Sequence, residues 1–250
     1  MSVPKPRRKS DSIWRYMSVA ELFSILDQRQ LIFRQFRSLR RDDRAEGAIP
    51  EDLYDRDLIL KLDPEARLSG EVANVDLLHS TYVQCWHRGT KENSAFWKIY
   101  GERGVAVRSK ISRFEQQVFW RKYSLKGEDI VYADTWEEAE EKGLMVPAGI
   151  TPNRSSMRRK RHAFSWEEEW RIFYQPPTTK YGIIAGGSAA EQEAARQAWR
   201  RDCPEYEKIA VDSIKWISEI VVAPAAPMWV FETINTIVKR HSVRCRASEI

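Results

Sequence analysis

The chain has 250 residues, of which 42% are hydrophobic and 31% are charged, so one large domain or two small ones with a buried core are expected. Basic residues outnumber acidic ones by 41 to 36, and the net charge of +5 permits a nucleic-acid partner without demanding one. The three cysteines show no CxxC spacing, which argues against a zinc ribbon. No apolar stretch approaches the ~18 residues of a membrane span, so no membrane partner is expected.

Residues 1–12 are expected to form a disordered basic tail, because the opening is polar and contains the cationic stretch Lys5–Lys9. It lacks the apolar segment of a secretory signal. The three cysteines suggest no disulfide framework, so a reducing, cytoplasmic location is expected. Residues 13–250 mix strand and helix patterns without regular alternation. This order predicts a single α+β domain, with helices packed around a mixed-sheet core and a mostly helical insertion near residues 51–79.

The first strand is expected at Ile13–Met17, and a helix follows from Val19 to Gln28. Ser18 with Glu21 three residues later has the capping-box pattern that starts such a helix. Further strands are expected at residues 31–34, 80–87, 104–109, 129–132, 164–174, 216–224 and 243–245. Further helices are expected at residues 94–100, 111–119, 189–201 and 228–241. The other segments are a loop or polar helix start at 37–50, an acidic solvent-facing segment at 135–142 and a flexible connector at 182–188.

The aromatic-rich segment Phe164–Tyr174 is the most informative part of the chain. Alternate residues of a strand share a face, so one face is expected to carry Glu167, Glu169 and Arg171, and Glu168 is expected on the other. Carboxylates and a guanidinium in a row are costly to bury unless they pair or contact a ligand. A salt-bridged sheet surface and a ligand site therefore both remain open.

A cationic run lies just upstream of these carboxylates. It consists of Arg158, Arg159, Lys160 and Arg161. Such a dense run is too charged to be fully buried, so most of it is expected to face solvent or a polyanion. These residues are therefore the expected nucleic-acid contacts.

Two earlier strands carry further candidates. Arg15 is flanked by Trp14 and Tyr16, and an arginine in this setting can clamp a phosphate or pair with an acid. His87 ends a strand and can serve as an acid or base, although a structural role is the common alternative.

A divalent-metal site is the other possibility, with oxygen ligands from Asp43, Glu46, Glu167 and Glu169 if the two segments meet.

Several ordered motifs resemble a bacterial family of unknown function. They begin with Trp14-Arg15-Tyr16-Met17 and Asp43-x-x-Glu46-Gly47, continue with Tyr82-x-x-Cys85-Trp86-His87, Ser94-x-x-Trp97-x-x-Tyr100 and Gly104-Val105-Ala106-Val107, and end with Lys160-Arg161-x-x-Phe164-x-x-Glu167-x-Glu169-x-Arg171, Ile220–Pro224 and Pro227-x-Trp229. The resemblance covers about residues 13–250. It implies a family but no activity.

The chain also resembles, more remotely, the ADP-ribosyltransferase superfamily in the order of Arg15, the Leu22–Leu26 helix, the Cys85–His87 strand and Glu169. This resemblance implies NAD as the cofactor and an ADP-ribosyltransferase-like fold. It implies Glu169 as the catalytic carboxylate, and Glu167 as the residue that orients the acceptor or supports Arg171. It also implies cofactor contacts from Arg15, Tyr16, Trp86 and Arg171, with Trp86 or His87 as the middle element of the site.

Three hypotheses follow from these patterns. The first is an NAD-dependent ADP-ribosyltransferase-like protein without a metal, with a nucleic acid or a protein as acceptor and a role in toxicity or phage defence. The second is a metal-dependent nuclease or phosphodiesterase built on Asp43, Glu46, Glu167 and Glu169 with Lys160. The third is a non-enzymatic nucleic-acid-binding or interaction protein whose tryptophans stack on bases. The first requires that Arg15, Trp86, His87, Glu167, Glu169 and Arg171 converge on one cleft. The second requires that the segment of Asp43 and Glu46 meets the segment of Glu167 and Glu169.

Overall fold

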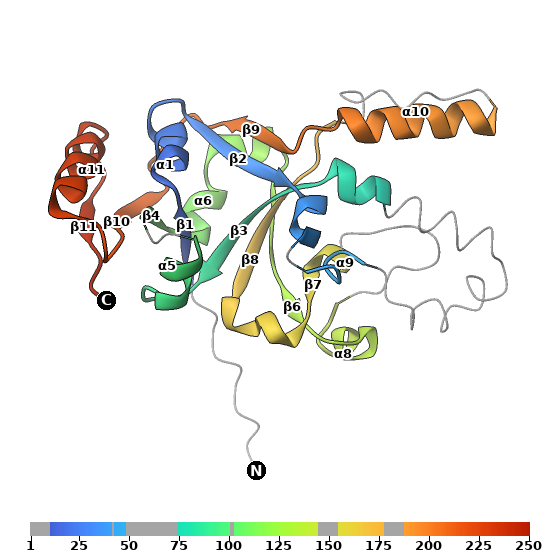
Figure 1. The fold of residues 1–250 in the computed structure, drawn as a ribbon, viewed down its shortest axis with the longest axis horizontal. Coiled ribbons are helices and arrows are strands. Elements are labelled where there is room, and N and C mark those ends of the chain that lie inside the picture. The colour runs from blue at the N-terminus through green and yellow to red at the C-terminus, as the bar shows by residue number, and fades with distance from the viewer. Residues whose placement is uncertain (1–10, 42, 49–74, 101–102, 145–154, 178–187) are drawn as a thin grey trace, which may run out of the picture.

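The computed structural model describes residues 11–41, 43–48, 75–100, 103–144, 155–177 and 188–250 (Figure 1). These residues form an α+β fold around a mixed sheet of nine strands, as the strand and helix patterns predict. The strands of this sheet are β1 (Ser12–Met17), β2 (Gln30–Gln35), β3 (Tyr82–Arg88), β4 (Val105–Lys110), β5 (Lys126–Asp129), β8 (Glu169–Tyr174), β9 (Tyr206–Ala210), β10 (Ile217–Val222) and β11 (Cys245–Ala247). A separate parallel pair joins β6 (Val131–Tyr132) to β7 (Arg159–Lys160).

The helices lie on both faces of the sheet and beyond its edges (Figure 1). They are α1 (Val19–Leu26), α5 (Ser94–Tyr100), α6 (Ile111–Glu115), α7 (Val118–Lys122), α8 (Trp136–Glu141), α9 (Ser155–Arg158), α10 (Ala189–Asp202) and α11 (Met228–Arg240), with 3-10 helices η1 (Phe36–Arg41) and η2 (His162–Glu167). Residues 75–80 are also helical. None of the helices in the described ranges combines the length and apolar sequence that a membrane span needs.

The main core packs α1, α6, α7 and α11 against one face of the sheet. Trp86 of β3 packs there against Phe114 of α6, and Ile172 of β8 and Leu22 of α1 belong to the same cluster. The opposite face carries two smaller apolar clusters. One is built around Tyr16 and α5, and the other around Phe36 and η1.

The sheet is incomplete along one edge of β3. Strand β8 pairs with β3 from Tyr82 to His87 and so occupies the whole of the other edge. Strands β1 and β2 must then share the remaining edge, where β1 pairs at His87 and Arg88 and β2 pairs at Tyr82 and Val83. Residues 84–86 therefore have no strand neighbour there among the described strands, and we call this stretch the sheet gap. Two side-chain donors bridge it: Arg15 Nη1 to the Cys85 oxygen at 3.1 Å and Gln84 Nε2 to the Ile32 oxygen at 3.2 Å.

The capping box that Ser18 and Glu21 predict is confirmed, and it starts α1 at Val19. The predicted helix at 94–100 is also confirmed. The expected single helix at 111–119 is instead two short helices, α6 and α7, and the sequence patterns missed β9. The acidic segment 135–142 forms α8, whose Trp136 is fully buried. The expected connector at 182–187 and residues 51–74 of the expected insertion lie outside the described residues.

Two boundary predictions are wrong. The disordered tail was expected to reach residue 12, but Ser12 begins β1, and Asp11 accepts a hydrogen bond from the Ser112 hydroxyl. The segment 164–174 is not one strand, because η2 runs to Glu167 and Glu168 takes a left-handed conformation with φ 42° before β8 begins. This kink breaks the expected alternation of faces.

Candidate functional site

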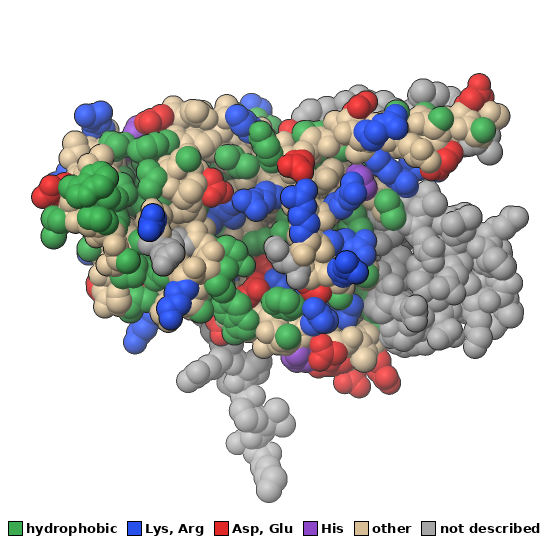
Figure 2. Space-filling view, viewed as in Figure 1, with side chains coloured by type: hydrophobic (Ala, Val, Ile, Leu, Met, Phe, Trp, Pro, Cys, Tyr) green, Lys and Arg blue, Asp and Glu red, His purple; other side chains and the backbone are tan. Residues whose placement is uncertain are grey.

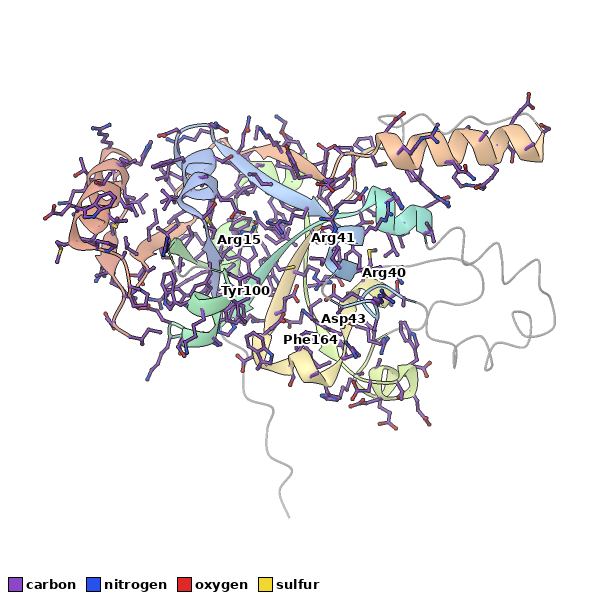
Figure 3. All side chains as sticks on the ribbon, viewed as in Figure 1. Arg15, Arg40, Arg41, Asp43, Tyr100 and Phe164 are labelled. Carbon is purple, nitrogen blue, oxygen red and sulfur yellow. The ribbon has the colours of Figure 1, made fainter. Side chains whose placement is uncertain are left out.

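A cleft of about 510 Å³ opens on the face that carries α5 and η1, and its volume is within the range of small-molecule sites, roughly 300–1,000 Å³. Residues of β1, β2, β3, α5, η2 and β8 line it. Among the predicted site residues, those that border the cleft are Arg15, Tyr16, Asp43, Glu46, Trp86, His87, Lys160, Glu167, Glu169 and Arg171. In Figure 3, the labelled Arg15 and Tyr100 lie to one side of β8, and Arg40 and Asp43 lie to the other.

Three carboxylates converge on one ammonium group in this cleft. Lys160 Nζ lies 2.6 Å from Glu167 Oε2, 3.3 Å from Glu169 Oε2 and 3.3 Å from Glu46 Oε1. All four side chains are largely buried. Lys160 reaches them from β7, which is placed by its pairing with β6. Three of the four residues predicted to hold a metal are therefore arranged around a lysine.

Arg171 is the second cation in this cluster and binds two of the three carboxylates, Glu169 and Glu46. Its Nε donates to Glu169 Oε1 at 2.6 Å, and its Nη2 donates to Glu169 Oε2 at 2.9 Å and Glu46 Oε1 at 3.2 Å. Its Nη1 donates to the Met157 oxygen at 2.8 Å, and its guanidinium lies over the Phe36 ring. With 1% of its surface exposed, Arg171 is a buried support for the carboxylates.

The protonation of the two glutamates differs for physical reasons. Burial alone would raise the pKa of Glu169, but the charges of Arg171 and Lys160 outweigh it and lower that pKa to about 2. Burial raises the pKa of Glu167, and the attraction of Lys160 offsets this only in part. Burial would lower the pKa of Lys160, yet the charges of Glu169, Glu46 and Glu167 raise it overall. Glu169 is thus firmly ionised, whereas Glu167 accepts a proton more readily.

Arg15 stands at the sheet gap. It donates to the Cys85 oxygen and to Glu21 Oε1 at 3.2 Å. Glu21 is the same residue that closes the capping box of α1, so the start of this helix also orients the arginine. Its side chain remains 15% exposed and borders the cleft. Arg34 of β2 lines the cleft from the other side of the gap, and no described residue forms a hydrogen bond or ion pair with its side chain.

An aromatic wall faces the charged cluster. Tyr16 stacks on Phe96 with ring centroids 5.3 Å apart, and its hydroxyl accepts from the Asn93 amide. Tyr100 and Trp166 stand at the rim, 52% and 40% exposed. Burial and the nearby Glu167 carboxylate raise the pKa of Tyr100 to about 12, so its hydroxyl stays protonated and can donate. Tyr16 therefore supports this wall, while Tyr100 and Trp166 are the exposed rings.

His87 lies between the aromatic wall and the carboxylates. Its ring packs on Phe96 at 4.8 Å, and its Nδ1 lies 2.8 Å from the Glu167 main-chain oxygen. A carbonyl oxygen only accepts, so Nδ1 carries the proton in this contact. His87 thereby anchors the backbone of Glu167, and its Nε2 has no hydrogen-bond partner among the described residues.

Trp86, which the resemblance implies as a cofactor contact, has its ring in the main core. Cys85 and His87 face the cleft, so Trp86, which alternates with them on β3, points to the opposite face. Its indole packs against Phe114 and Trp216 in the main core and is 1% exposed. Although the residue borders the cleft, its ring is a core side chain.

The exposure expected for the basic run is also wrong for most of its members. Arg159 is buried, donates to the oxygens of Ala133 and Asp134 and lies over the Trp136 ring. Lys160 is enclosed by its three carboxylates. Arg158 pairs with Glu128 at 2.7 Å, and only Arg161 is half exposed, where it pairs with Asp43. Arg158, Lys160 and Arg161 are thus paired with acids, and Arg159 is bonded to main-chain oxygens, so the run is not a free cationic surface.

The structure offers little support for a metal site built on these acids. Asp43 is engaged by Arg161 at 2.8 Å, away from Lys160. Across the described ranges, no group of three or more His, Cys, Asp or Glu residues is arranged to hold a metal ion. The carboxylates that do meet already have two cations as partners.

Several residues of the cleft were missed by the sequence patterns, among them Arg34, Phe96, Tyr100 and Trp166. Tyr100 and Trp166 lie within the sequence motifs described above, but the sequence does not indicate that their side chains are exposed to solvent. Comparisons with protein-family models, with curated proteins and with solved structures gave no match.

Proposed function

We propose that the cleft binds NAD and transfers its ADP-ribose to an acceptor. The observation that carries this proposal is the juxtaposition, in one cleft, of arginines at the sheet gap, a carboxylate with an unused oxygen and exposed aromatic rings. A dinucleotide offers matching groups: phosphates for guanidinium donors, ribose hydroxyls for carboxylates and flat rings for aromatic side chains. A fold resembling the ADP-ribosyltransferases is part of the same proposal.

Glu167 is the better candidate for contact with the ribose. Both oxygens of Glu169 accept from Arg171, and Oε2 also faces Lys160. Glu167 uses Oε2 for Lys160, whereas its Oε1 has no hydrogen-bond partner among the described residues. We therefore assign ligand contact to Glu167 and the positioning of Lys160 to Glu169, which reverses the assignment that the motif order implies.

The phosphates of NAD would lie near Arg15 and Arg34, which face each other across the sheet gap. Arg34 has its donors available, and Arg15 is held in place by Glu21. The exposed rings of Tyr100 or Trp166 would hold the nicotinamide. Lys160 keeps Glu167 oriented in a water-poor site, where a carboxylate interacts strongly with a positive charge on the ribose.

The proposed reaction breaks the bond between the nicotinamide nitrogen and the ribose carbon, and nicotinamide leaves with the bonding electrons. The acceptor nucleophile forms the new bond to that carbon and gives up its proton to solvent. NAD and the acceptor thus become nicotinamide, ADP-ribosylated acceptor and a proton. Glu167 stabilises the charge that develops on the ribose, which is the step where preorganised groups contribute most.

The test is the release of nicotinamide from NAD by the purified chain, with a metal chelator present. Glu167→Gln keeps the shape of the side chain and removes its charge, so kcat should fall about 10²- to 10³-fold with little change in NAD affinity. Glu168→Gln is the matched control, because Glu168 is exposed and lies outside the cleft. It should retain parental activity.

Two results would contradict the proposal. Equal nicotinamide release by Glu167→Gln and the parent would remove the carboxylate from the chemistry. Nuclease activity that appears with magnesium and disappears with the chelator would instead support the metal-dependent alternative, despite the lysine at the centre of the carboxylates.

A further inference from the structure

A second cationic surface lies beside the cleft and is distinct from the internal run at 158–161. Residues 34–41 contain four arginines and no acid, and Arg44 follows closely. Arg34, Arg37, Arg41 and Arg44 are exposed. Figure 2 shows Lys and Arg side chains gathered over η1 and the neighbouring part of the sheet. We call residues Arg34, Arg37, Arg40, Arg41 and Arg44 the arginine rim.

Most of the arginine rim is free of acidic partners. The side chains of Arg34, Arg37 and Arg44 form no hydrogen bond or ion pair within the described part of the chain. Arg41 pairs with Glu205, but both side chains are more than 70% exposed, at 75% and 72%, so the pair is weak and easily exchanged. Like charges this close repel one another, and the negative charge of a bound polyanion relieves that repulsion. The counterions that the polyanion releases on binding also favour the complex.

The arginine rim follows η1 and reaches the cleft at Arg34. Arg37 and Arg40 are three residues apart in the 3-10 helix η1, so they lie on the same side of it. Arg34 precedes them on β2 and lines the cleft, as does Leu39. A chain of phosphates laid along η1 would therefore lead into the cleft mouth.

Exposed aromatic rings stand on the other side of that mouth. Tyr100 and Trp166 line the cleft and remain about half exposed. Figure 3 shows Tyr100 and Arg40 on opposite sides of β8. Aromatic rings of this kind stack on bases, and a base can reach them only when it is not stacked inside a duplex.

We infer that the arginine rim and the exposed ring of Trp166 bind a single-stranded nucleic acid, which leaves Tyr100 for the nicotinamide, and that this strand is the acceptor of ADP-ribose. The binding part rests on the surface alone, whereas the acceptor part rests on the proposed function. The acceptor nucleophile is then a ring nitrogen, an amine or a phosphate oxygen of the strand, which bonds to the ribose carbon as nicotinamide leaves. A folded protein acceptor would need no such cluster of exposed arginines.

The binding test uses fluorescein-labelled 20-nucleotide single strands of RNA and of DNA, and the DNA duplex, without NAD. Anisotropy gives the affinity between 50 and 200 mM salt. The parent should bind a single strand more tightly than the duplex. Arg37→Ala/Arg44→Ala should flatten the slope of log affinity against log salt by about 1.4, because each lost phosphate contact contributes roughly 0.7. Trp166→Ala should weaken binding about 5- to 150-fold.

Matched controls lie away from the cleft. Arg113→Ala/Arg121→Ala removes the same charge from α6 and α7, and Trp229→Ala removes an exposed tryptophan of α11, 68% exposed. Both should bind like the parent. Duplex binding as tight as single-strand binding, or equal losses in the controls, would overturn the inference.

The transfer test adds NAD and follows ADP-ribose on the oligonucleotide by mass spectrometry. The inference predicts ADP-ribosylated oligonucleotide with the parent and much less of it with Arg37→Ala/Arg44→Ala. Without oligonucleotide, the two proteins should release nicotinamide equally. Nicotinamide release with no oligonucleotide binding, or transfer to protein alone, overturns the inference and leaves the proposed function standing. Oligonucleotide binding with no nicotinamide release refutes the proposed function and the acceptor role, but leaves the surface assignment standing.

Discussion

Replacing Arg171 with methionine should destabilise the protein by about 3–5 kcal/mol. Arg171 is 1% exposed, and it supplies hydrogen bonds to both oxygens of Glu169, to Glu46 and to the Met157 carbonyl. Methionine is unbranched and fits irregular spaces, so the main loss is the cation and not the volume. Glu169 and Glu46 would then be buried beside Lys160 alone. Leaving buried charges uncompensated costs far more than an ion pair contributes at the surface.

Urea unfolding of the parent and the variant measures this loss as a difference in the free energy of unfolding. Arg41→Met is the control, because Arg41 forms a solvent-exposed pair with Glu205 and its loss should change stability by less than about 0.5 kcal/mol. Glu169→Met/Arg171→Met removes both main partners and should recover part of the stability. A loss below about 1 kcal/mol in Arg171→Met would refute the view that this buried network holds the site together.

Three further predictions concern the same region. The folded-state pKa of Glu169, about 2, is below its ordinary value of 4.5, so its ionisation stabilises the fold above pH 4.5. This contribution should be lost as the pH falls toward 2, and unfolding measurements across that range should show the parent losing more stability than Glu169→Gln. Trp86→Ala should cost about 3–5 kcal/mol in urea unfolding and leave NAD affinity unchanged, which a cofactor-stacking role would not allow. Arg15→Ala should weaken NAD binding about 10- to 100-fold by calorimetry, and an unchanged dissociation constant would remove Arg15 from the phosphate site.

The local features of the fold were predictable from the sequence. Ser18 and Glu21 are close along the chain, so their capping box requires no tertiary information. Within β8, the predicted alternation of sheet faces is also correct, because Glu169 and Arg171 line the cleft and Trp170 packs in the core. The prediction that the strand includes Glu167 and Glu168 is wrong because a 3-10 helix and a left-handed residue precede β8. Alternation of residue types along the sequence does not indicate where such a strand begins.

The site required information from distant parts of the chain. Arg159 and Lys160 read as a surface run because their partners, at residues 133–134 and at Glu46, Glu167 and Glu169, meet them only in the fold. The inward side of Trp86 depends on which face of β3 meets α6. The sheet gap arises because β1 and β2 pair with different ends of the same edge of β3, and such long-range pairing cannot be predicted from local sequence patterns.

A crystal structure of the protein with bound NAD tests the central claim most directly. The account predicts a ribose hydroxyl on the nicotinamide side within hydrogen-bond distance of Glu167 Oε1, with the phosphates between Arg15 and Arg34 and a ring against Tyr100 or Trp166. NAD bound outside this cleft would contradict the account. So would NAD whose ribose contacts neither Glu167 nor Glu169.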